Sequence, residues 1–297
     1  MATVREIRNQ IGSVQNIKKI TETMEKISTA KVKKNTKRLA SSREYYHSLI
    51  GLMDHLIQYF KDDGLATDHP LIKSHDSIAN SLILVITSNR GLCGGYNNNV
   101  LQLTKKLYST LKEEEKAIKL FTIGKKGISY FQFNKIPTDQ TFTDIDDHVD
   151  FDRMASIADQ LSDLYSTEKV DEVYLVYTKY LSGGQQRPAV EKILPFDVET
   201  NETEELSEDY RPIYLFEPAG HEVLDRILPV ALRIKVFNTI LQTNLSEQIA
   251  RKIAMKQASD SAGDMIKDLS LLYNRARQNK ITKELIEIMG AAKALHS

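Results

Sequence analysis

Apolar residues recur at steps of three or four along the start of the chain. The positions between them are polar, charged or glycine, and the apolar ones are Val4, Ile7, Ile11, Val14, Ile17, Ile20, Met24 and Ile27. This spacing places them on one face of an α-helix. Thr3 and Glu6 form a capping-box pair at its start, and strong breakers follow only at 62–64. The pattern predicts one helix of about 55–60 residues.

The last part of the chain repeats this pattern. Pro229 can occupy the first turn of a helix, and no proline follows it. The stripe behind it consists of Ile234, Phe237, Leu241, Leu245, Ile249, Ile253, Met265, Leu269, Leu272, Ala276, Leu285 and Ile288. Helices of about 85–100 Å exceed the diameter of about 50 Å of a compact chain of this length. We therefore expect two projecting helices that pair antiparallel, with a seam that wanders around each helix because the steps are irregular.

Between these ends, short apolar runs alternate with helical patterns. Strands are predicted at 81–87, 117–123 and 172–178, with further candidates at 189–195 and 212–216, and helices near 125–133 and 151–166. An acidic segment without periodicity, 197–209, is interpreted as a surface loop. Strands that alternate with helices are typical of a doubly wound sheet.

The predicted fold class is therefore α/β. It consists of a long antiparallel coiled coil of the N- and C-terminal helices and a doubly wound, Rossmann-like domain. The expected limits are 1–62 for the first coiled-coil helix, 63–76 for a linker, 77–218 for the α/β domain and 219–297 for the second coiled-coil helix.

Composition and charge narrow the possible environment and partners. No run approaches the about 18 apolar residues of a spanning helix, and the single Cys93 excludes a disulfide scaffold. The polar start is unlike a signal or transit peptide, so we expect a reducing compartment, the cytoplasm. The net charge is zero, but basic and acidic residues are distributed unevenly along the chain. Residues 1–60 hold 11 basic and 5 acidic residues, residues 76–218 hold 15 basic and 24 acidic, and residues 221–297 hold 12 basic and 8 acidic. Such asymmetry typically reports partners.

The first predicted strand is followed by a glycine-rich segment, 90–95, at the place where a Rossmann-like fold binds a nucleotide. The segment matches neither the dinucleotide fingerprint nor the P-loop motif, which favours a plain strand-to-helix turn. Cys93 is interpreted as a buried thiol rather than a nucleophile. The seven histidines show no metal-ligand spacing. The sequence thus predicts no catalytic residue, cofactor site or metal site.

A basic cluster in the first helix allows three interpretations. Its members are Lys31, Lys33, Lys34, Lys37 and Arg38. It could bind nucleic acid, form a solvated helix face, or face an acidic protein surface. The residues alone therefore leave three functions open: mechanical coupling through the paired ends, nucleotide chemistry at 90–95, and nucleic-acid binding by a coiled coil.

Three separated groups of residues, in this order, resemble the gamma subunit of F-type ATP synthases. The N-terminal group comprises Arg5-Glu6-Ile7-Arg8, Lys19-Ile20-Thr21-Glu22-Thr23-Met24-Glu25 and Ala30-Lys31. The middle group is Ser88-Asn89-Arg90-Gly91-Leu92-Cys93-Gly94-Gly95-Tyr96-Asn97. The C-terminal group comprises Ser246-Glu247-Gln248-Ile249-Ala250-Arg251, Met255-Lys256, Ala258-Ser259-Asp260, Tyr273-Asn274-Arg275-Ala276-Arg277-Gln278 and Ile281-Thr282-Lys283-Glu284. The resemblance covers nearly the whole chain.

The resemblance implies a central rotor shaft of the bacterial type. The coiled coil would lie inside a hexamer of alternating alpha and beta subunits, and the α/β domain would stand at its foot against the epsilon subunit and the c-ring. Ion flow would turn ring and shaft together, while ATP chemistry would occur on beta. The chain would then be no enzyme, hold no cofactor, bind no nucleic acid, and reach the cytoplasmic face of the inner membrane only through the complex.

The same resemblance assigns coupling contacts to eight residues: Met24, Lys31, Lys33, Lys34, Arg251, Gln278, Thr282 and Glu284. Of these, Met24 and Arg251 would pack in the coupling region of the shaft, near a turn at 277–278. The three residues at 278–284 would contact a catch loop on beta, and the three lysines would face an acidic lever on beta.

Overall fold

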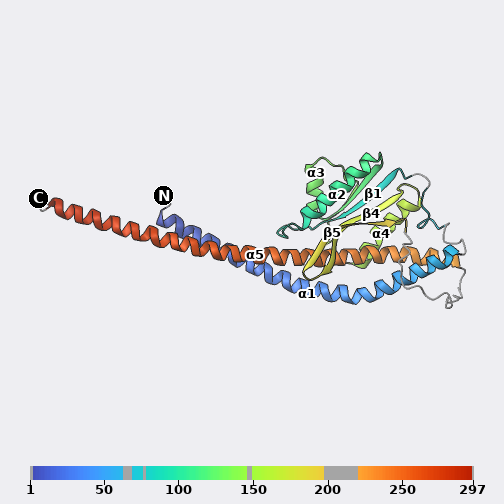
Figure 1. Ribbon diagram of the computed structural model, residues 1–297, viewed down its shortest axis with the longest axis horizontal. Helices are drawn as coiled ribbons and strands as arrows, with labels where there is room; N and C mark the ends of the chain where they lie inside the picture. Colours follow the sequence, from blue (N-terminus) through green and yellow to red (C-terminus); the bar gives the residue numbers. More distant parts are fainter. Residues whose placement is uncertain (1–2, 63–68, 76–77, 146–148, 197–219, 296–297) are drawn as a thin grey trace. The chain divides into compact units, whose positions relative to one another are not determined.

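The computed structural model describes residues 3–62, 69–75, 78–145, 149–196 and 220–295. The chain divides into two compact units: a helical unit of residues 1–30 and 251–297, and a sheet unit of residues 31–250. Two long helices, α1 (Val4–Asp62) and α5 (Gly220–Leu295), contribute residues to both units (Figure 1). The prediction of a coiled coil of the two terminal helices joined to an α/β domain is confirmed.

The two long helices begin differently. At the start of α1, the Thr3 N–H donates to Glu6 Oε2 at 2.8 Å and the Glu6 N–H donates to Thr3 Oγ1 at 3.3 Å, which is the predicted capping box. The expected place of Pro229 is wrong, because α5 begins at Gly220 and the proline lies inside the helix. An internal proline costs about 3 kcal/mol. Its neighbours Leu228 and Ala231 are fully buried, and their packing offsets that cost.

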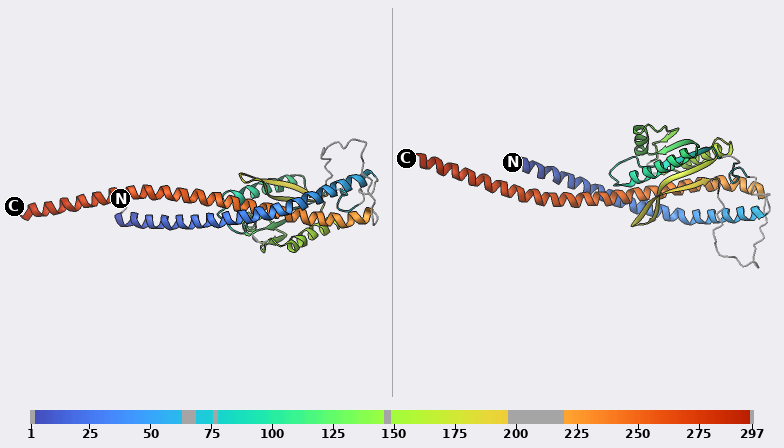
Figure 2. Two further views of the ribbon diagram at one scale, coloured as in Figure 1. Left: turned by 90° about the horizontal axis from the view of Figure 1, so that it is seen from below. Right: turned by 45° about the horizontal axis from the view of Figure 1, so that its top comes forward.

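In the helical unit, α1 and α5 lie side by side and antiparallel in all three views (Figures 1 and 2). In α1 the buried residues are Ile7, Thr21 and Ser28, which are separated by multiples of seven residues. In α5 they are Arg251, Met255, Ser259 and Ala262, which are separated by steps of four, four and three residues. A seven-residue repeat keeps one face of a helix against its partner. The buried residues of α5 do not keep this repeat once Arg251 is included, and the wandering seam stays a prediction.

Only part of the predicted apolar stripe of α1 lies in the seam: Ile7 is buried, but three later members are exposed. Ile20 is 60% exposed, and Ile17 and Ile27 are about half exposed, whereas the polar Thr21 is buried. The Thr21 hydroxyl lies 2.9 Å from the Lys18 carbonyl oxygen, so its own helix satisfies it in the seam. Each residue turns the helix by about 100°. A shift of one residue in the seam therefore takes Ile20 out of the contact.

The sheet unit contains a five-stranded sheet in the order β3-β2-β1-β4-β5. The strands are β1 (Asn80–Ile86), β2 (Ala117–Ile123), β3 (Gln140–Phe142), β4 (Glu172–Ser182) and β5 (Gln185–Leu194). The first four are parallel to their neighbours, and β5 pairs antiparallel with β4. The sheet is thus the predicted doubly wound one, with an antiparallel edge.

Two features of the sheet were not predicted. The three-residue β3 is too short to give a pattern, and β4 and β5 form a hairpin whose strands run beyond the predicted 172–178 and 189–195. The hairpin turns at the dipeptide Gly183-Gly184. This dipeptide is typical of a hairpin turn and was an unused signal in the sequence. The predicted strand at 212–216 and the predicted loop at 197–209 lie outside the described residues.

Helices cover both faces of the sheet. One face packs α2 (Tyr96–Glu113) and α3 (Lys125–Phe133) over Ile83, Val85 and Leu120. The other packs α4 (Phe151–Ser166) together with the parts of α1 and α5 that belong to the sheet unit over Leu82, Leu84 and Leu175. The helices predicted at 125–133 and 151–166 are confirmed.

Candidate functional site

The helical unit exposes more large apolar side chains than its own seam uses. Beside the exposed isoleucines of α1, α5 exposes Ile253, Met265, Leu271 and Leu272. Burying one such side chain fully contributes about 1.5–3 kcal/mol. Apolar side chains gathered on one exposed surface mark a contact with another macromolecule.

The C-terminal stretch of α5 is the most exposed part of this surface. In Figures 1 and 2, α5 extends past the N-terminal end of α1. Every described side chain from 277 to 289 is exposed. Five of them are large and apolar: Ile281, Leu285, Ile286, Ile288 and Met289, the last 71% exposed. Leu285-Ile286 and Ile288-Met289 are adjacent pairs, and at about 100° per residue the five side chains spread over an arc of about 160°. We call residues 277–295 the bare helix.

Eight charged side chains of the helical unit form ion pairs within their own helix. The ion pairs are Lys18–Glu22, Asp264–Lys267, Lys280–Glu284 and Lys283–Glu287, with N–O distances of 2.9–3.9 Å. The hydrogen bond from Lys267 lowers the pKa of Asp264. Exposed pairs of this kind contribute little to stability.

The glycine-rich segment of the sheet unit is a turn held by its own side chains. Asn97 Oδ1 accepts from the Ser88 N–H at 2.9 Å, and Asn97 Nδ2 donates to Cys93 Sγ at 3.2 Å. Leu92 and Gly94 have φ of 62° and 58°. Cys93 is buried, as predicted. These contacts support the interpretation of 90–95 as a strand-to-helix turn.

The carboxyl ends of β1 and β2 are closed by backbone packing at Gly124. Its φ is 95°, and a Cβ there would lie 2.2 Å from the Thr87 carbonyl oxygen. The Thr87 hydroxyl accepts from the Gly127 N–H at 2.9 Å. That N–H belongs to the first turn of α3, the kind of group that binds phosphate in nucleotide-binding folds. Here a side chain of the chain itself occupies it.

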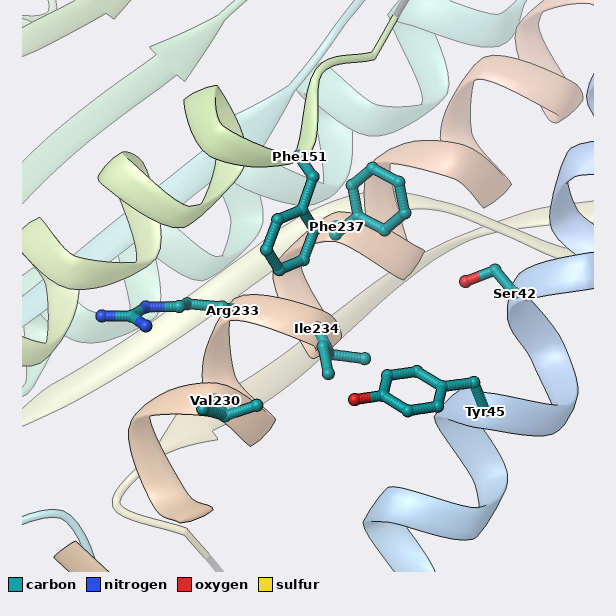
Figure 3. A pocket seen from close by; sticks show the side chains of 7 residues that line it. All are labelled: Ser42, Tyr45, Phe151, Val230, Arg233, Ile234 and Phe237. Atoms are coloured by element: carbon teal, nitrogen blue, oxygen red, sulfur yellow. The ribbon is translucent and has the colours of Figure 1, made fainter. Parts of the chain in front are cut away.

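A cavity of about 360 Å³ lies between α1, the start of α4, and α5 within the sheet unit. Its lining residues are Ser42, Tyr45, Phe151, Val230, Arg233, Ile234 and Phe237 (Figure 3). The rings of Phe151 and Phe237 pack edge to face, with 5.3 Å between their centroids. The Arg233 guanidinium points away from this ring pair and contacts Asp159 at 2.6 Å. The hydroxyls of Ser42 and Tyr45 are the polar groups of the lining besides Arg233, and the other four lining residues are apolar.

The described residues also give no sign of a metal centre or a membrane span. Within these ranges, no group of three His, Cys, Asp or Glu side chains is placed to hold a metal ion. Likewise, none of the helices described here is long and apolar enough to cross a membrane.

Comparison with known proteins decides the family. The ATP synthase family model matches residues 3–295. The chain is 38% identical to the ATP synthase gamma chain of Rhodopirellula baltica, over 99% of each chain. It is 37% identical to that of Leptospira biflexa, over 99% of this chain and 100% of the relative. The chain belongs to the ATP synthase gamma-chain family. The resemblance carried by the three groups of motifs is thereby confirmed.

Solved structures share the gamma-chain fold. A chain of the Euglena gracilis mitochondrial ATP synthase aligns with a TM-score of 0.67 at 18% identity, over 99% of this chain and 94% of that one. A chain from the Tetrahymena thermophila enzyme, in a structure of its central stalk and c-ring, aligns with a TM-score of 0.62 at 23% identity, over 81% and 99%. The two long helices and the sheet are thus a shared architecture.

The expected coupling residues of this gamma-family chain are spread along both units. Met24 is partly buried and Arg251 is 6% exposed in the helical unit. Gln278, Thr282 and Glu284 lie exposed on the bare helix, where Glu284 contacts Lys280 at 3.6 Å. In the sheet unit, Lys33 and Lys34 are exposed and Lys31 is partly exposed.

The structure does not bring Met24 and 277–278 together. Residues 277–278 lie inside α5 rather than at a turn. A Cβ on Gly263 would lie 3.5 Å from Lys18 Nζ, which sets the antiparallel register and places Met24 near residue 257. Gln278 is then about 30 Å farther along α5, at about 1.5 Å per residue. The expected packing of Met24 near 277–278 is wrong because the helix continues straight through that segment.

Sequence reasoning missed part of the interaction surface. It placed Leu285 and Ile288 on the stripe that packs inside the coil, and it left out Ile286 and Met289. The adjacent apolar pairs were the available signal, because they widen the apolar face beyond the narrow stripe of a coiled-coil seam.

Proposed function

We propose that this chain is the central shaft of a rotary ATP synthase. Its helical unit lies within a hexamer of alternating alpha and beta subunits, and its sheet unit contacts the epsilon subunit and the c-ring. Rotation of the ring turns the shaft, and the shaft imposes conformational changes on the catalytic beta subunits. The chain itself carries out no chemistry and is held at the cytoplasmic face of the inner membrane by the complex alone.

The bare helix is the observation that carries this proposal. A single helix with a broad exposed apolar face is unfavourable in water, and contact with surrounding subunits would bury that face. Relatives over the full length are named ATP synthase gamma chains. Together these observations favour a shaft enclosed by other subunits over nucleotide chemistry at 90–95, where the chain's own groups fill the site, and over nucleic-acid binding.

A shaft that touches three catalytic subunits differently can bias their conformations, whereas equal contact would shift nothing. In this proposal Met24 and Arg251 set the packing of the coupling region. Gln278, Thr282 and Glu284 contact a loop of beta, and Lys31, Lys33 and Lys34 face acidic residues of beta. The proposed domain limits remain 1–62, 63–76, 77–218 and 219–297.

The first test is reconstitution of the full chain with alpha and beta subunits, followed by native mass spectrometry. We expect a complex with one copy of this chain per three beta subunits. Stable failure to co-assemble would refute the proposal.

Surface variants sharpen this test. The side chains of Ile281 and Leu285 are already in water, so the double change Ile281→Ser with Leu285→Ser should leave melting of the isolated chain unchanged. In the complex the same change should weaken association at least tenfold, since about 1.4 kcal/mol corresponds to a factor of ten. Leu181→Ser in the β4–β5 hairpin is the matched control, exposed but outside the helical unit. Equal association of both variants would contradict a buried role for the bare helix.

A further inference from the structure

The end of α3 carries an apolar side chain that the fold does not use. Phe133 is 87% exposed, more than any other large apolar residue among those described. Phe131, two positions earlier, is fully buried against the sheet. The helix therefore already has its core contact. The ring of Phe133 is therefore free to contact another molecule. It belongs to the part of the sheet unit where α3 is labelled in Figure 1.

A shallow hollow is lined by residues that flank Phe133 in the chain. Its volume is about 560 Å³, and it is lined by Ile128, Gln132, Lys135, Ile136, Pro137 and Thr138. The lining combines aliphatic groups with a few polar ones, a composition suited to alternate side chains of a peptide.

The segment that leaves this hollow becomes an edge strand. Residues 136–138 lead into β3 (Gln140–Phe142), which pairs with β2 and ends the described sheet on this side. The side chains of Gln140 and Thr141 are exposed. The outer edge of a terminal strand presents backbone groups that an extended chain can pair with. Hollow and edge together favour an extended segment over a helix.

Charge limits the kind of segment further. Lys125, Lys126 and Lys135 are exposed on α3 and the turn after it. Of the described acids near this edge, Asp139 accepts from the Leu120 N–H at 2.8 Å, and Asp144 is paired with Arg153 at 2.6 Å. This corner is basic although residues 76–218 as a whole are acidic, with 15 basic and 24 acidic residues. Lys135, which lines the hollow, and the two lysines at the start of α3 complement a partner that is acidic and apolar.

We propose that Phe133, the hollow and the edge of β3 form a docking site for an extended, acidic and apolar segment of another protein chain. Phe133 inserts between the apolar side chains of that segment, the lysines pair with its carboxylates, and its backbone extends the sheet beyond β3. This site lies in the sheet unit and does not depend on the shaft role of the helical unit.

The test is a titration of the purified full chain with three fluorescent ten-residue peptides. One alternates Asp and Val, one alternates Lys and Val, and one alternates Asp and Ser. We expect the Asp-Val peptide to bind at least tenfold more tightly than the other two. Equal binding of the three peptides, or preference for either of the others, would overturn the proposal.

Variants locate the binding. Phe133→Ser should weaken Asp-Val binding at least fivefold and Lys135→Glu at least threefold, with unchanged melting temperatures because both side chains are exposed. Leu181→Ser, which removes an exposed apolar group elsewhere in the sheet unit, should bind like the unmodified chain. If Phe133→Ser also bound like the unmodified chain, the peptide would be bound elsewhere and the proposal would be wrong.

Discussion

The carboxylate of Asp171 holds together the start of β1, the segment before it and α4. It accepts from the backbone N–H groups of Ala79 and Asn80 at 2.9 and 2.7 Å, and it contacts His75 Nδ1 at 2.7 Å. The His75 ring in turn stacks on Tyr165, with 4.7 Å between ring centroids. Asp171 itself is buried. A loss of its charge should therefore be felt throughout this corner of the sheet unit.

The expected cost follows from these bonds. A hydrogen bond to a charged group contributes about 1.5–3 kcal/mol and a neutral one about 0.5–1.5 kcal/mol. Asp171→Asn keeps one acceptor oxygen for the two backbone N–H groups, but it removes the charge and turns an NH₂ group toward His75. We expect this variant to lower the free energy of unfolding by about 2–4 kcal/mol. Asp171→Ala leaves the donors without an acceptor and should cost about 4 kcal/mol or more.

The effect should depend on pH with a defined sign. Burial alone would raise the pKa of Asp171, but hydrogen bonds from His75, Asn80 and Ala79 lower it below its ordinary value. A carboxyl with a lowered pKa stabilises the fold above its unfolded pKa of about 3.9 and loses that contribution as the pH falls through the folded pKa. The difference in unfolding free energy between the unmodified chain and Asp171→Asn should have its full size at pH 7 and should shrink below about pH 4.

Urea unfolding followed by near-ultraviolet circular dichroism of the tyrosines measures both effects. Asp163→Asn on the exposed side of α4 is the control with the same change of charge, and it should stay within about 0.5 kcal/mol of the unmodified chain. A loss below about 0.5 kcal/mol for Asp171→Asn at pH 7, or a difference that does not change with pH, would refute the reasoning.

Three further outcomes are expected. Gly124→Ala should destabilise the sheet unit by more than about 2 kcal/mol, because its Cβ would lie 2.2 Å from a backbone oxygen, whereas Gly51→Ala in α1 meets nothing within 4 Å and should stabilise by up to about 1 kcal/mol in thermal melts. Glu191→Gln should remove the ion pair with Lys235 at 3.0 Å. Burial alone would raise the pKa of Glu191, but this pair lowers it. The loss of unfolding free energy, measured in urea, should therefore be larger at pH 7 than at pH 4. Met24→Lys should reduce ATP-driven proton pumping by the assembled complex more than it reduces assembly, since it adds a cation to a partly buried basic seam, and normal pumping would contradict this.

Much of the architecture was predictable because it is local. The capping box at Thr3 and Glu6, the branched run of β1 and the spacing that predicts α4 depend only on neighbouring residues. The antiparallel hairpin of β4 and β5 and the three residues of β3 depend on pairing between strands. Such pairing leaves little trace in a single segment.

The surface that faces partners was predicted only in part. The motifs indicated the family, but the apolar stripe through Ile20 was assigned to the seam, and Phe133 was not singled out. Periodicity shows that a helix has an apolar face, but not what covers that face. The bare helix appears only when α1 and α5 are set in register, because the register decides where one helix ends beside the other.

The long terminal helices, the alternating strands of the middle and the turn at 90–95 can be predicted from local patterns, since helix propensity, strand propensity and turn chemistry act over a few residues. That Thr21 lies in the seam while Ile20 faces outward depends on the packing of α1 against α5. That choice is made by the register between two segments more than two hundred residues apart. A shift of one residue, about 100° of rotation, exchanges the buried side of a helix for an exposed one.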